Sequence, residues 1–112
     1  MDCIFCRIIN GEIRSDILYQ DEEVIAIRDI NPQAPTHLLV LPKSHIASLA
    51  HLGADQKPLL GHLLHVANEL AKKGGISDKG YRLVINSGAE AGQEVPHLHL
   101  HLLGGRPLGK MG

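Results

Sequence analysis

The stretch His97-Leu98-His99-Leu100-His101-Leu102-Leu103, followed by Gly104-Gly105, alternates three imidazoles with apolar side chains. Successive side chains of a β-strand point to opposite faces, so a strand places the three histidines on one face and the leucines between them on the other. In a helix the same spacing would scatter the imidazoles around the axis. The pattern therefore predicts a strand whose leucine face packs on a core and whose histidine face lines a polar site.

Three imidazoles on one face indicate a chemical role, because burying them together is unfavourable and their protonated forms repel one another. Two kinds of chemistry fit the spacing. Three imidazoles with one open position are a ligand set of catalytic zinc. Alternatively, a neutral imidazole attacks phosphorus and forms a covalent intermediate, while a neighbouring imidazole protonates the leaving group.

The loop before the histidines favours the second kind of chemistry. Residues 86–94 read Asn-Ser-Gly-Ala-Glu-Ala-Gly-Gln-Glu and lead into the histidine strand. Glycines such as Gly88 and Gly92 let backbone N–H groups approach an anion, although many loops with two glycines are ordinary turns. A phosphate held by this loop beside a histidine nucleophile is a coherent site.

Size and charge limit the class of protein. A chain of 112 residues, 44% of them hydrophobic, is sufficient for a single domain over residues 1–112 with a core of its own. The formal net charge of −1 and the 3% of aromatic residues argue against nucleic-acid binding. No apolar run reaches the roughly 18 residues that span a bilayer, and the N-terminus lacks the pattern of a secretory signal. We therefore expect a cytoplasmic protein without membrane contact.

Periodicity along the chain predicts an α+β fold. We expect a short helix over residues 3–10 and a long amphipathic helix over 55–73, with Pro58 in its first turn and Gly74-Gly75 at its end. Besides the histidine strand, apolar runs bounded by turn residues predict strands over 17–20, 24–28, 37–41 and 81–85. Because helices and strands do not alternate strictly, the sheet of about five strands should be antiparallel.

Cys3 and Cys6 have the spacing of half a tetrahedral zinc site. In a reducing compartment they are thiols or metal ligands rather than a structural disulfide. The other two ligands would have to be histidines, and the candidates are His45, at a strand exit, and His97. The alternative is that both thiols are small buried hydrophobic groups.

Three polar residues stand at the ends of predicted strands. Asp29 can accept both hydroxyls of a ribose, or it can cap the turn in which it lies. His37 and His45 are either partners of the histidine strand or ordinary strand-end residues. We assign no role to the remaining histidines, which fall on predicted helix or loop surface: His51, His62 and His65.

The histidine stretch resembles the motif of the histidine triad (HIT) family, His-φ-His-φ-His-φ-φ, in which φ is an apolar residue. The resemblance covers nearly the whole chain and is closest to the histidine triad nucleotide-binding (HINT) branch of bacterial type. The other stretches that carry it are Ile30-Asn31-Pro32-Gln33-Ala34-Pro35-Thr36-His37, Pro42-Lys43-Ser44-His45, Gly80-Tyr81-Arg82, Gly92-Gln93-Glu94-Val95 and Leu103-Gly104-Gly105-Arg106-Pro107.

The resemblance implies an α+β homodimer whose two sheets join, and a hydrolase of purine nucleoside phosphoramidates and aminoacyl adenylates without an organic cofactor. His99, the middle histidine of the motif, would attack the α-phosphorus and form a nucleotidyl-histidine intermediate, and His101 would contact the phosphate oxygens. Asp29 matches the ribose-binding acid. Residues that match the nucleobase pocket are Ile4, Phe5, Ile8, Ile27 and Ile30. Residues that match the surroundings of the phosphate are Asn86, Gly92, Glu94 and Val95.

Two departures from the branch bear on this interpretation. Glu94 stands where many members carry a serine. Unlike a hydroxyl, a carboxylate cannot donate a hydrogen bond, and it repels a phosphate. The backbone N–H of this position remains available. Many members also lack the cysteine pair. Branches that keep it resemble zinc proteins, and their ligand set corresponds here to Cys3, Cys6, His45 and His97. The zinc would then be structural, and His97 would take no part in the chemistry.

Three other functions compete with the phosphoramidase. A dinucleoside polyphosphate hydrolase of the neighbouring branch is disfavoured by the ending Gly104-Gly105-Arg106-Pro107. A nucleotide-binding regulator would keep nucleotide affinity without turnover. A metal-binding module built on the triad would lose its metal when His99 and His101 are replaced, but would keep it without Cys3.

Overall fold

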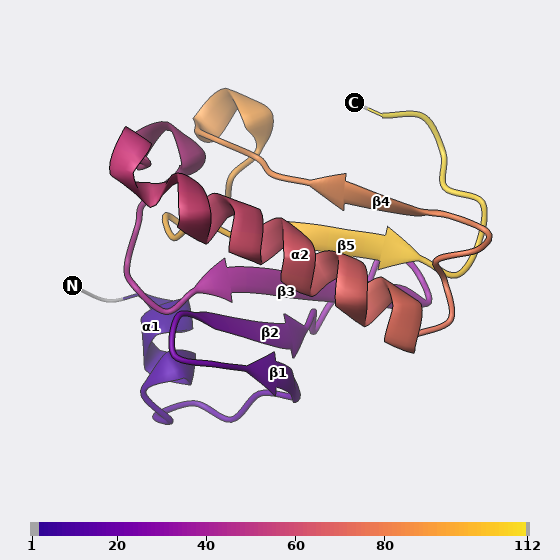
Figure 1. The fold of residues 1–112 in the computed structure, drawn as a ribbon, viewed down its shortest axis with the longest axis horizontal. Helices are drawn as coiled ribbons and strands as arrows, with labels where there is room; N and C mark the ends of the chain where they lie inside the picture. The colour runs from indigo at the N-terminus through magenta and orange to yellow at the C-terminus, as the bar shows by residue number, and fades with distance from the viewer. Residues whose placement is uncertain (1–2, 112) are drawn as a thin grey trace.

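The computed structural model describes residues 3–111. Five strands form one antiparallel sheet in the order β1-β2-β3-β5-β4. The strands are Ile17–Gln20 (β1), Val24–Arg28 (β2), Thr36–Pro42 (β3), Tyr81–Val84 (β4) and Leu100–Gly104 (β5). The long helix α2, Lys57–Lys73, crosses one face of the sheet, and the short helix α1, Ile4–Ile9, lies beside β1 and β2 (Figure 1). The prediction of an α+β fold with one long and one short helix is confirmed.

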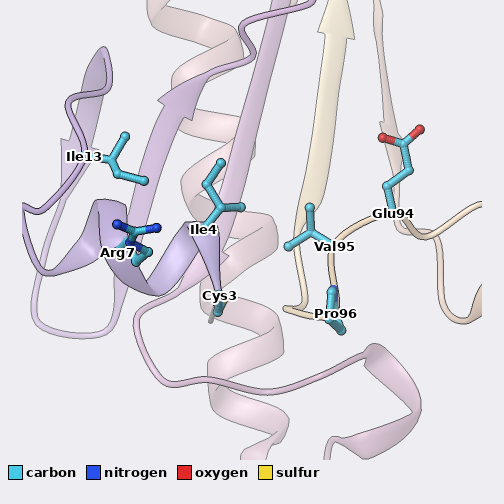
Figure 2. A pocket seen from close by; sticks show the side chains of 7 residues that line it. All are labelled: Cys3, Ile4, Arg7, Ile13, Glu94, Val95 and Pro96. Carbon is cyan, nitrogen blue, oxygen red and sulfur yellow. The ribbon is translucent and has the colours of Figure 1, made fainter. Parts of the chain in front are cut away.

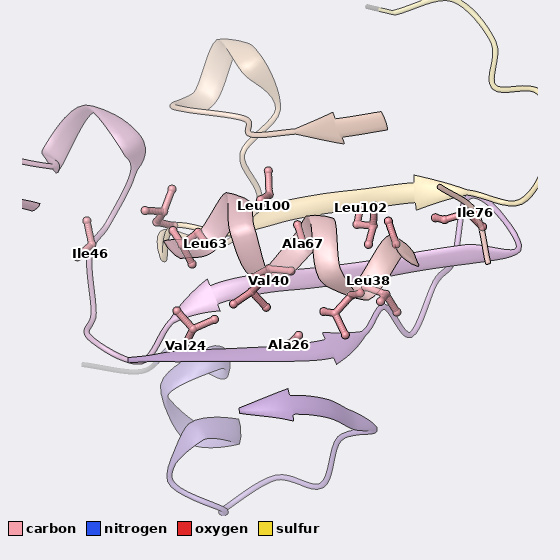
Figure 3. Packing of buried hydrophobic residues seen from close by; sticks show 14 residues of the cluster. Val24, Ala26, Leu38, Val40, Ile46, Leu63, Ala67, Ile76, Leu100 and Leu102 are labelled. Carbon is pink, nitrogen blue, oxygen red and sulfur yellow. The ribbon is translucent and has the colours of Figure 1, made fainter. Parts of the chain in front are cut away.

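The main core lies between α2 and the sheet (Figure 3). The predicted leucine face is confirmed, because Leu98, Leu100 and Leu102 are all buried in this core. The apolar stripe of α2 packs against them, as the helical spacing of its residues requires. The stripe consists of Leu63, Val66, Ala67, Leu70 and Ala71.

A smaller apolar cluster covers the opposite face of the two central strands and holds α1. Alternate residues of β2 and β3 point into it, while their neighbours point into the main core. The cluster consists of Cys3, Phe5, Ile25, Ile27, Leu39 and Leu41. Because β2 and β3 are covered on both faces, they consist of continuous apolar runs instead of alternating ones.

The histidine strand begins later than predicted. Its pairing with β3 starts at Leu100, so residues 97–99 precede the strand. The physical reason is a competing backbone hydrogen bond, because the N–H of Leu98 donates to the carbonyl of Ile46 at 2.6 Å. The accepting carbonyl of Ile46 belongs to the loop after β3 rather than to the sheet ladder. The side chains of residues 97–99 nevertheless keep the predicted sides, with the leucine toward α2 and the histidines away from it.

Helix α2 begins at Lys57 rather than at residue 55, because a single 3₁₀ turn, Ala54–Gln56, precedes it. Pro58 lies in the first turn, where its missing N–H would have no intrahelical partner. At the other end the N–H of Gly74 donates to the carbonyl of Leu70 at 2.9 Å. Of the helices in residues 3–111, none is long and apolar enough to span a membrane.

A polar cluster that we did not predict ties α2 to the turn between β1 and β2. His62, expected on the surface, places Nε2 2.6 Å from Oδ2 of Asp21, and the Tyr19 hydroxyl donates to the same carboxylate at 2.6 Å. Burial would raise the pKa of Asp21. The hydrogen bonds from Tyr19, from His62 and from the backbone N–H groups of Glu23 and Val24 instead hold that pKa well below its usual value.

Candidate active site

His99 occupies the centre of the site and has a fixed tautomer. Its ring is 8% exposed and contacts the rings of Phe5 and His101, with centroid distances of 5.2 and 5.1 Å. Nδ1 lies 2.7 Å from the main-chain carbonyl oxygen of His97. Because a carbonyl oxygen only accepts hydrogen bonds, Nδ1 carries the proton, and Nε2 of the neutral ring keeps its lone pair. Such a nitrogen is a competent nucleophile.

His101 has a fixed tautomer of the opposite kind, set by a chain of hydrogen bonds through His37. The backbone N–H of Gln33 donates to Nδ1 of His37 at 3.0 Å, so a neutral His37 carries its proton on Nε2. That Nε2 lies 2.9 Å from Nδ1 of His101 and donates to it. His101 therefore carries its own proton on Nε2, where it can donate to a ligand.

Burial keeps both members of this histidine chain neutral. Burial, followed by the neighbouring His99 and His37, lowers the pKa of His101 to about 4, against a smaller opposing effect of Asp29. Burial also lowers the pKa of His37, although Asp29 opposes the change. Oδ2 of Asp29 lies 3.4 Å from Nε2 of His37, and Oδ1 accepts the N–H of Asn31 at 2.8 Å. Asp29 therefore caps its turn and also faces the histidine chain.

A second polar group joins the N-terminal cysteines to His45 and His97, with four potential ligand atoms within 4.8 Å of one another. Nδ1 of His97 lies 3.4 Å from Sγ of Cys3 and 3.7 Å from Sγ of Cys6. Nδ1 of His45 lies 3.3 Å from Sγ of Cys6. Nε2 of His97 donates to the carbonyl of Pro42 at 2.8 Å, which leaves the Nδ1 lone pair directed at the sulfurs.

These distances fit a tetrahedral zinc ion. Zinc–sulfur bonds of about 2.3 Å and zinc–nitrogen bonds of about 2.0 Å separate the ligand atoms by roughly 3.5 Å. Burial lowers the pKa of His97, which keeps its ring neutral, as a metal ligand must be. Burial, with a smaller contribution from Cys3, raises the pKa of Cys6. A cation at this position would supply the charge that stabilises the thiolates.

The three triad histidines do not converge on one point among the described residues. The only other group of ligand atoms within 4.8 Å there consists of Asp29, His37 and His101. Nε2 of His37 carries a proton in that group, because Gln33 donates to Nδ1, so the nitrogen has no lone pair for a metal. The geometry thus gives no support to a metal site built on the triad.

The residues that match a nucleobase pocket lie on α1, on β2 and just after β2. Phe5 and Ile27 are buried in the smaller apolar cluster, and Ile8 packs against it. Ile4 and Ile30 are 46% and 86% exposed, so they offer apolar surface to a ligand. The structure therefore brings three of the five residues into one cluster and leaves two exposed.

A hollow of about 360 Å³ lies between α1 and the segment that leads to His97 (Figure 2). Ile4 of α1 faces Val95 across it, and Pro96 lies below Val95 (Figure 2). Glu94 stands at the rim on the same side as Val95, and its carboxylate is exposed. The hollow therefore adjoins two positions that match the surroundings of a phosphate.

The loop before the histidines is shaped by two glycines and closed by a glutamine. Gly88 and Gly92 have φ values of 91° and 86°, which side-chain-bearing residues rarely adopt. Oε1 of Gln93 accepts the N–H of Gly88 at 2.8 Å, and Nε2 donates to the carbonyl of Ala47 at 2.7 Å. Asn86 precedes this closed loop and is half-buried.

Two residues of the site received no definite role from the sequence. His37 sets the tautomer of His101, and its signal was present, because positions 37, 39 and 41 of a strand share the face turned toward the histidines. Gln93 closes the loop. No local pattern indicates this role, because its partner Ala47 lies 46 positions away in the sequence.

The fold and the site define an α+β protein in which a buried imidazole of fixed tautomer stands among other histidines directly before strand β5. The HIT domain model matches residues 10–108, so the chain belongs to the HIT family. The chain is 50% identical over 110 residues to the purine nucleoside phosphoramidase of Escherichia coli (strain K12), with 98% of this chain and 92% of the relative covered. An uncharacterized HIT-like protein from Synechococcus elongatus is 51% identical over 107 residues, which cover 96% of this chain and 93% of the relative.

Solved structures show the same fold. A histidine triad protein from Clostridium difficile superposes with a TM-score of 0.95 at 45% identity, covering 100% of this chain and 97% of that one. A HIT family hydrolase from Legionella pneumophila Philadelphia 1 gives a TM-score of 0.94 at 49% identity, with 96% of each chain covered.

We predict that the free energy of unfolding decreases as the pH falls from 6.5 to about 4, in part because of His101. Since its pKa is lowered in the folded protein, the unfolded chain binds the proton more readily in this interval. This contribution is complete above pH 6.5 and is lost progressively toward pH 4. Urea denaturation of the wild type and His101→Gln across the interval measures it. The free energy of unfolding of the variant should fall less over this interval. An equal fall in both proteins would contradict the prediction.

Proposed function

We propose that the protein is a purine nucleoside phosphoramidase that also accepts aminoacyl adenylates, releasing the amine or the acyl group from the α-phosphate. The observation that carries the proposal is the 2.7 Å hydrogen bond from Nδ1 of His99 to the carbonyl of His97. It leaves Nε2 as the ring nitrogen able to attack phosphorus. The 50% identity to the purine nucleoside phosphoramidase of Escherichia coli over nearly the whole chain supports the same substrate class.

The reaction would proceed by two displacements at phosphorus. First, the Nε2 lone pair of His99 forms a bond to the α-phosphorus while the bond to the leaving amine breaks, and the amine takes up a proton from solvent. Then water attacks the phosphorus and loses a proton to solvent, the bond to Nε2 breaks and returns the lone pair to His99, and the nucleoside monophosphate leaves with an oxygen from water. In the tautomer with its proton on Nδ1, His99 attacks directly through the Nε2 lone pair. The Nε2–H of His101 would donate to a phosphoryl oxygen and stabilise the charge that develops there.

The nucleotide would extend from His99 toward Asp29 and α1. Asp29 would accept the ribose hydroxyls, since each of its carboxylate oxygens has lone pairs beyond those used by Asn31 and His37. The apolar residues Ile4, Phe5, Ile8, Ile27 and Ile30 would enclose the purine. The phosphate would lie against Asn86, Gly92, Glu94 and Val95, with the backbone N–H of Glu94 as a donor in place of a side-chain hydroxyl.

Cys3, Cys6, His45 and His97 would hold a structural zinc ion. Four protein ligands leave no open position for substrate, so the ion would cross-link chain segments rather than act as a Lewis acid. Thiolate ligands persist in a reducing compartment, which supports a cytoplasmic location.

A homodimer in which two sheets join fits the topology. Strand β4 lies at one edge of the sheet, and all four of its residues are only half-buried. An exposed edge strand presents unpaired backbone groups to another strand. Pairing of β4 with the β4 of a second copy would satisfy those groups and continue the sheet.

The function is tested by comparing two substrates on the purified protein. An adenosine 5′-phosphoramidate carrying a fluorescent amine should be cleaved with a higher kcat/KM than a diadenosine polyphosphate. The reverse preference would assign the protein to the dinucleoside polyphosphate hydrolases. Binding of AMP without cleavage of either substrate would make it a nucleotide-binding regulator.

We predict that Asp29→Ala raises KM for the ribonucleotide substrate about tenfold or more, because a hydrogen bond to a charged group contributes about 1.5–3 kcal/mol. The wild type should prefer adenosine to 2′-deoxyadenosine phosphoramidate, and the variant should lose this preference. Asp29→Asn is the matched control, since its amide oxygen still accepts the N–H of Asn31 and keeps the turn capped. An unchanged ratio of the two substrates in Asp29→Ala would refute the ribose role.

A further inference from the structure

We propose that the metal cluster of Cys3, Cys6, His45 and His97 positions the nucleophile His99 and the helix α1, so that loss of the ion weakens nucleotide binding and catalysis besides lowering stability. The inference rests on the proposed function and on the fit of the cluster to zinc. It assigns Cys3, Cys6 and His45 as positioning residues that act on His99 without touching substrate.

The first link between the cluster and His99 runs through His97, which is restrained at three of its atoms, Nδ1, Nε2 and the carbonyl oxygen. Its Nδ1 faces the two sulfurs at 3.4 and 3.7 Å, and its Nε2 donates to the carbonyl of Pro42 at 2.8 Å. Its main-chain carbonyl accepts Nδ1–H of His99 at 2.7 Å. The residue that would bind the metal with its ring therefore orients the nucleophile with its backbone. A bound ion would hold that carbonyl, and with it the direction of the His99 Nε2 lone pair.

The second link runs through α1, which has only six residues. A helix of this length has little stability of its own and depends on tertiary contacts. Cys3 caps the helix, since the N–H of Cys6 donates to its sulfur at 3.4 Å, so both cysteines belong to the cluster and to the helix. A metal bond to each sulfur would anchor both ends of the first helical turn to His45 and His97.

Phe5 lies between the two cysteines in the sequence and connects the link through α1 with the link through His97. Its ring meets the ring of His97 edge-on at 5.7 Å and the ring of His99 at 5.2 Å. The same turn of helix carries Ile4, whose side chain faces Val95 across the hollow (Figure 2). Movement of α1 would therefore displace the packing of His99 and one wall of the proposed nucleotide site together.

Without the ion, two thiols and two imidazoles would remain with no common partner to hold them. His97 would keep the bond to Pro42, and α1 would keep its apolar contacts but lose its anchor to His45 and His97. A displacement of about 1 Å in a reacting group can lower a rate about a hundredfold. The expected signature is a combined loss of AMP affinity and kcat, which a purely structural metal remote from the site would not produce.

The test compares zinc-loaded wild type, chelator-treated wild type and Cys6→Ser, with Leu70→Ala as the matched control. Leu70 lies on the face of α2 that is buried in the main core, so its truncation lowers stability without touching the cluster or the site. We expect AMP affinity and kcat each to fall at least tenfold on metal loss, and to stay within twofold in Leu70→Ala. Zinc added back to the chelated protein should restore both, but it should not restore Cys6→Ser.

The tautomer of His99 provides a readout besides activity. Nitrogen chemical shifts of histidine-labelled protein should report one tautomer, protonated at Nδ1, in the zinc form and a mixture of tautomers in the metal-free form. Metal-free protein that stays folded, binds AMP within twofold of the zinc form and keeps the single tautomer would overturn the proposal. If the zinc form itself neither binds AMP nor cleaves the phosphoramidate, the proposed function fails instead.

Phe5→Leu covers the case in which the metal-free chain does not fold. This variant keeps both cysteines and both histidine ligands, and it should bind one zinc ion per chain. It removes the ring that contacts His97 and His99. We expect weaker AMP binding and a mixture of His99 tautomers despite full zinc occupancy. Because Phe5 is also proposed to contact the purine, the tautomer decides: an unchanged His99 tautomer would overturn the proposed link through α1, whatever the AMP affinity.

Discussion

Replacing His99 with alanine is expected to lower kcat for an adenosine 5′-phosphoramidate by roughly a thousandfold or more, the scale on which removal of a nucleophile acts in covalent catalysis. The variant lacks the only triad histidine whose Nδ1 donates its proton to a main-chain carbonyl and whose Nε2 keeps a lone pair. His101 cannot replace it, because its Nδ1 is occupied by His37 and its Nε2 carries the proton. Steady-state cleavage of the fluorescent substrate measures the loss.

AMP binding separates lost chemistry from a damaged pocket. Affinity should remain within a few-fold, since His99 would act on the reacting phosphorus while the proposed contacts to ribose and purine lie on other residues. His65→Ala on the exposed face of α2 is the control histidine replacement and should match the wild type. A His99→Ala protein that retains a tenth of the wild-type kcat would refute the nucleophile assignment.

Replacing Leu102 with alanine is expected to lower the free energy of unfolding by about 3–5 kcal/mol, as is typical when truncation leaves a cavity in a well-packed core. Leu102 is fully buried at the centre of the sheet, opposite Leu38 of β3 and Leu83 of β4, and faces α2. Alanine at this position would leave a cavity, because β3, β4 and α2 are regular elements that cannot move inward to fill it. Urea unfolding of the zinc-loaded protein measures the change.

Leu64→Ala is the matched control for the core. Leu64 lies on α2 and is 41% exposed, so its truncation should lower stability by less than about 1 kcal/mol. Because the side chain of Leu102 points away from the histidines, the folded Leu102→Ala variant should keep its kcat at low temperature. Equal destabilisation by the two replacements would contradict the placement of Leu102 in the core.

The alternation of residues 97–103 was enough to predict which side chains enter the core and which face the site. It was not enough to predict where the strand begins, because the N–H of Leu98 bonds to Ile46 in a distant loop. The long helix followed in the same way from the spacing of its leucines, whereas its first residue depended on a preceding 3₁₀ turn. Periods of two and 3.6 residues are properties of neighbouring residues, but the ends of elements depend on partners elsewhere.

The candidate site likewise combines features that follow from neighbouring residues with features that depend on partners elsewhere in the chain. The alternation singled out the triad, and the spacing of Cys3 and Cys6 singled out half of a zinc site. The spacing of the triad fitted either nucleophilic or metal chemistry, and both the loop before the histidines and the resemblance to the HIT family favoured nucleophilic chemistry. The tie between His62 and Asp21 had no local signal at all, since 41 positions separate the two residues.

The residue pattern established the α+β class, the core face of the central strand and the set of candidate histidines, because these follow from short-range periodicity. The protonation of each ring nitrogen followed from contacts between residues far apart in the chain: Pro42 with His97, 55 positions away, and His37 with His101, 64 positions away. A histidine has the same two nitrogens wherever it stands. Which one holds the proton depends on the partner that the folded chain places beside it. That difference separates the proposed nucleophile, the proposed hydrogen-bond donor and the candidate metal ligand within one five-residue stretch.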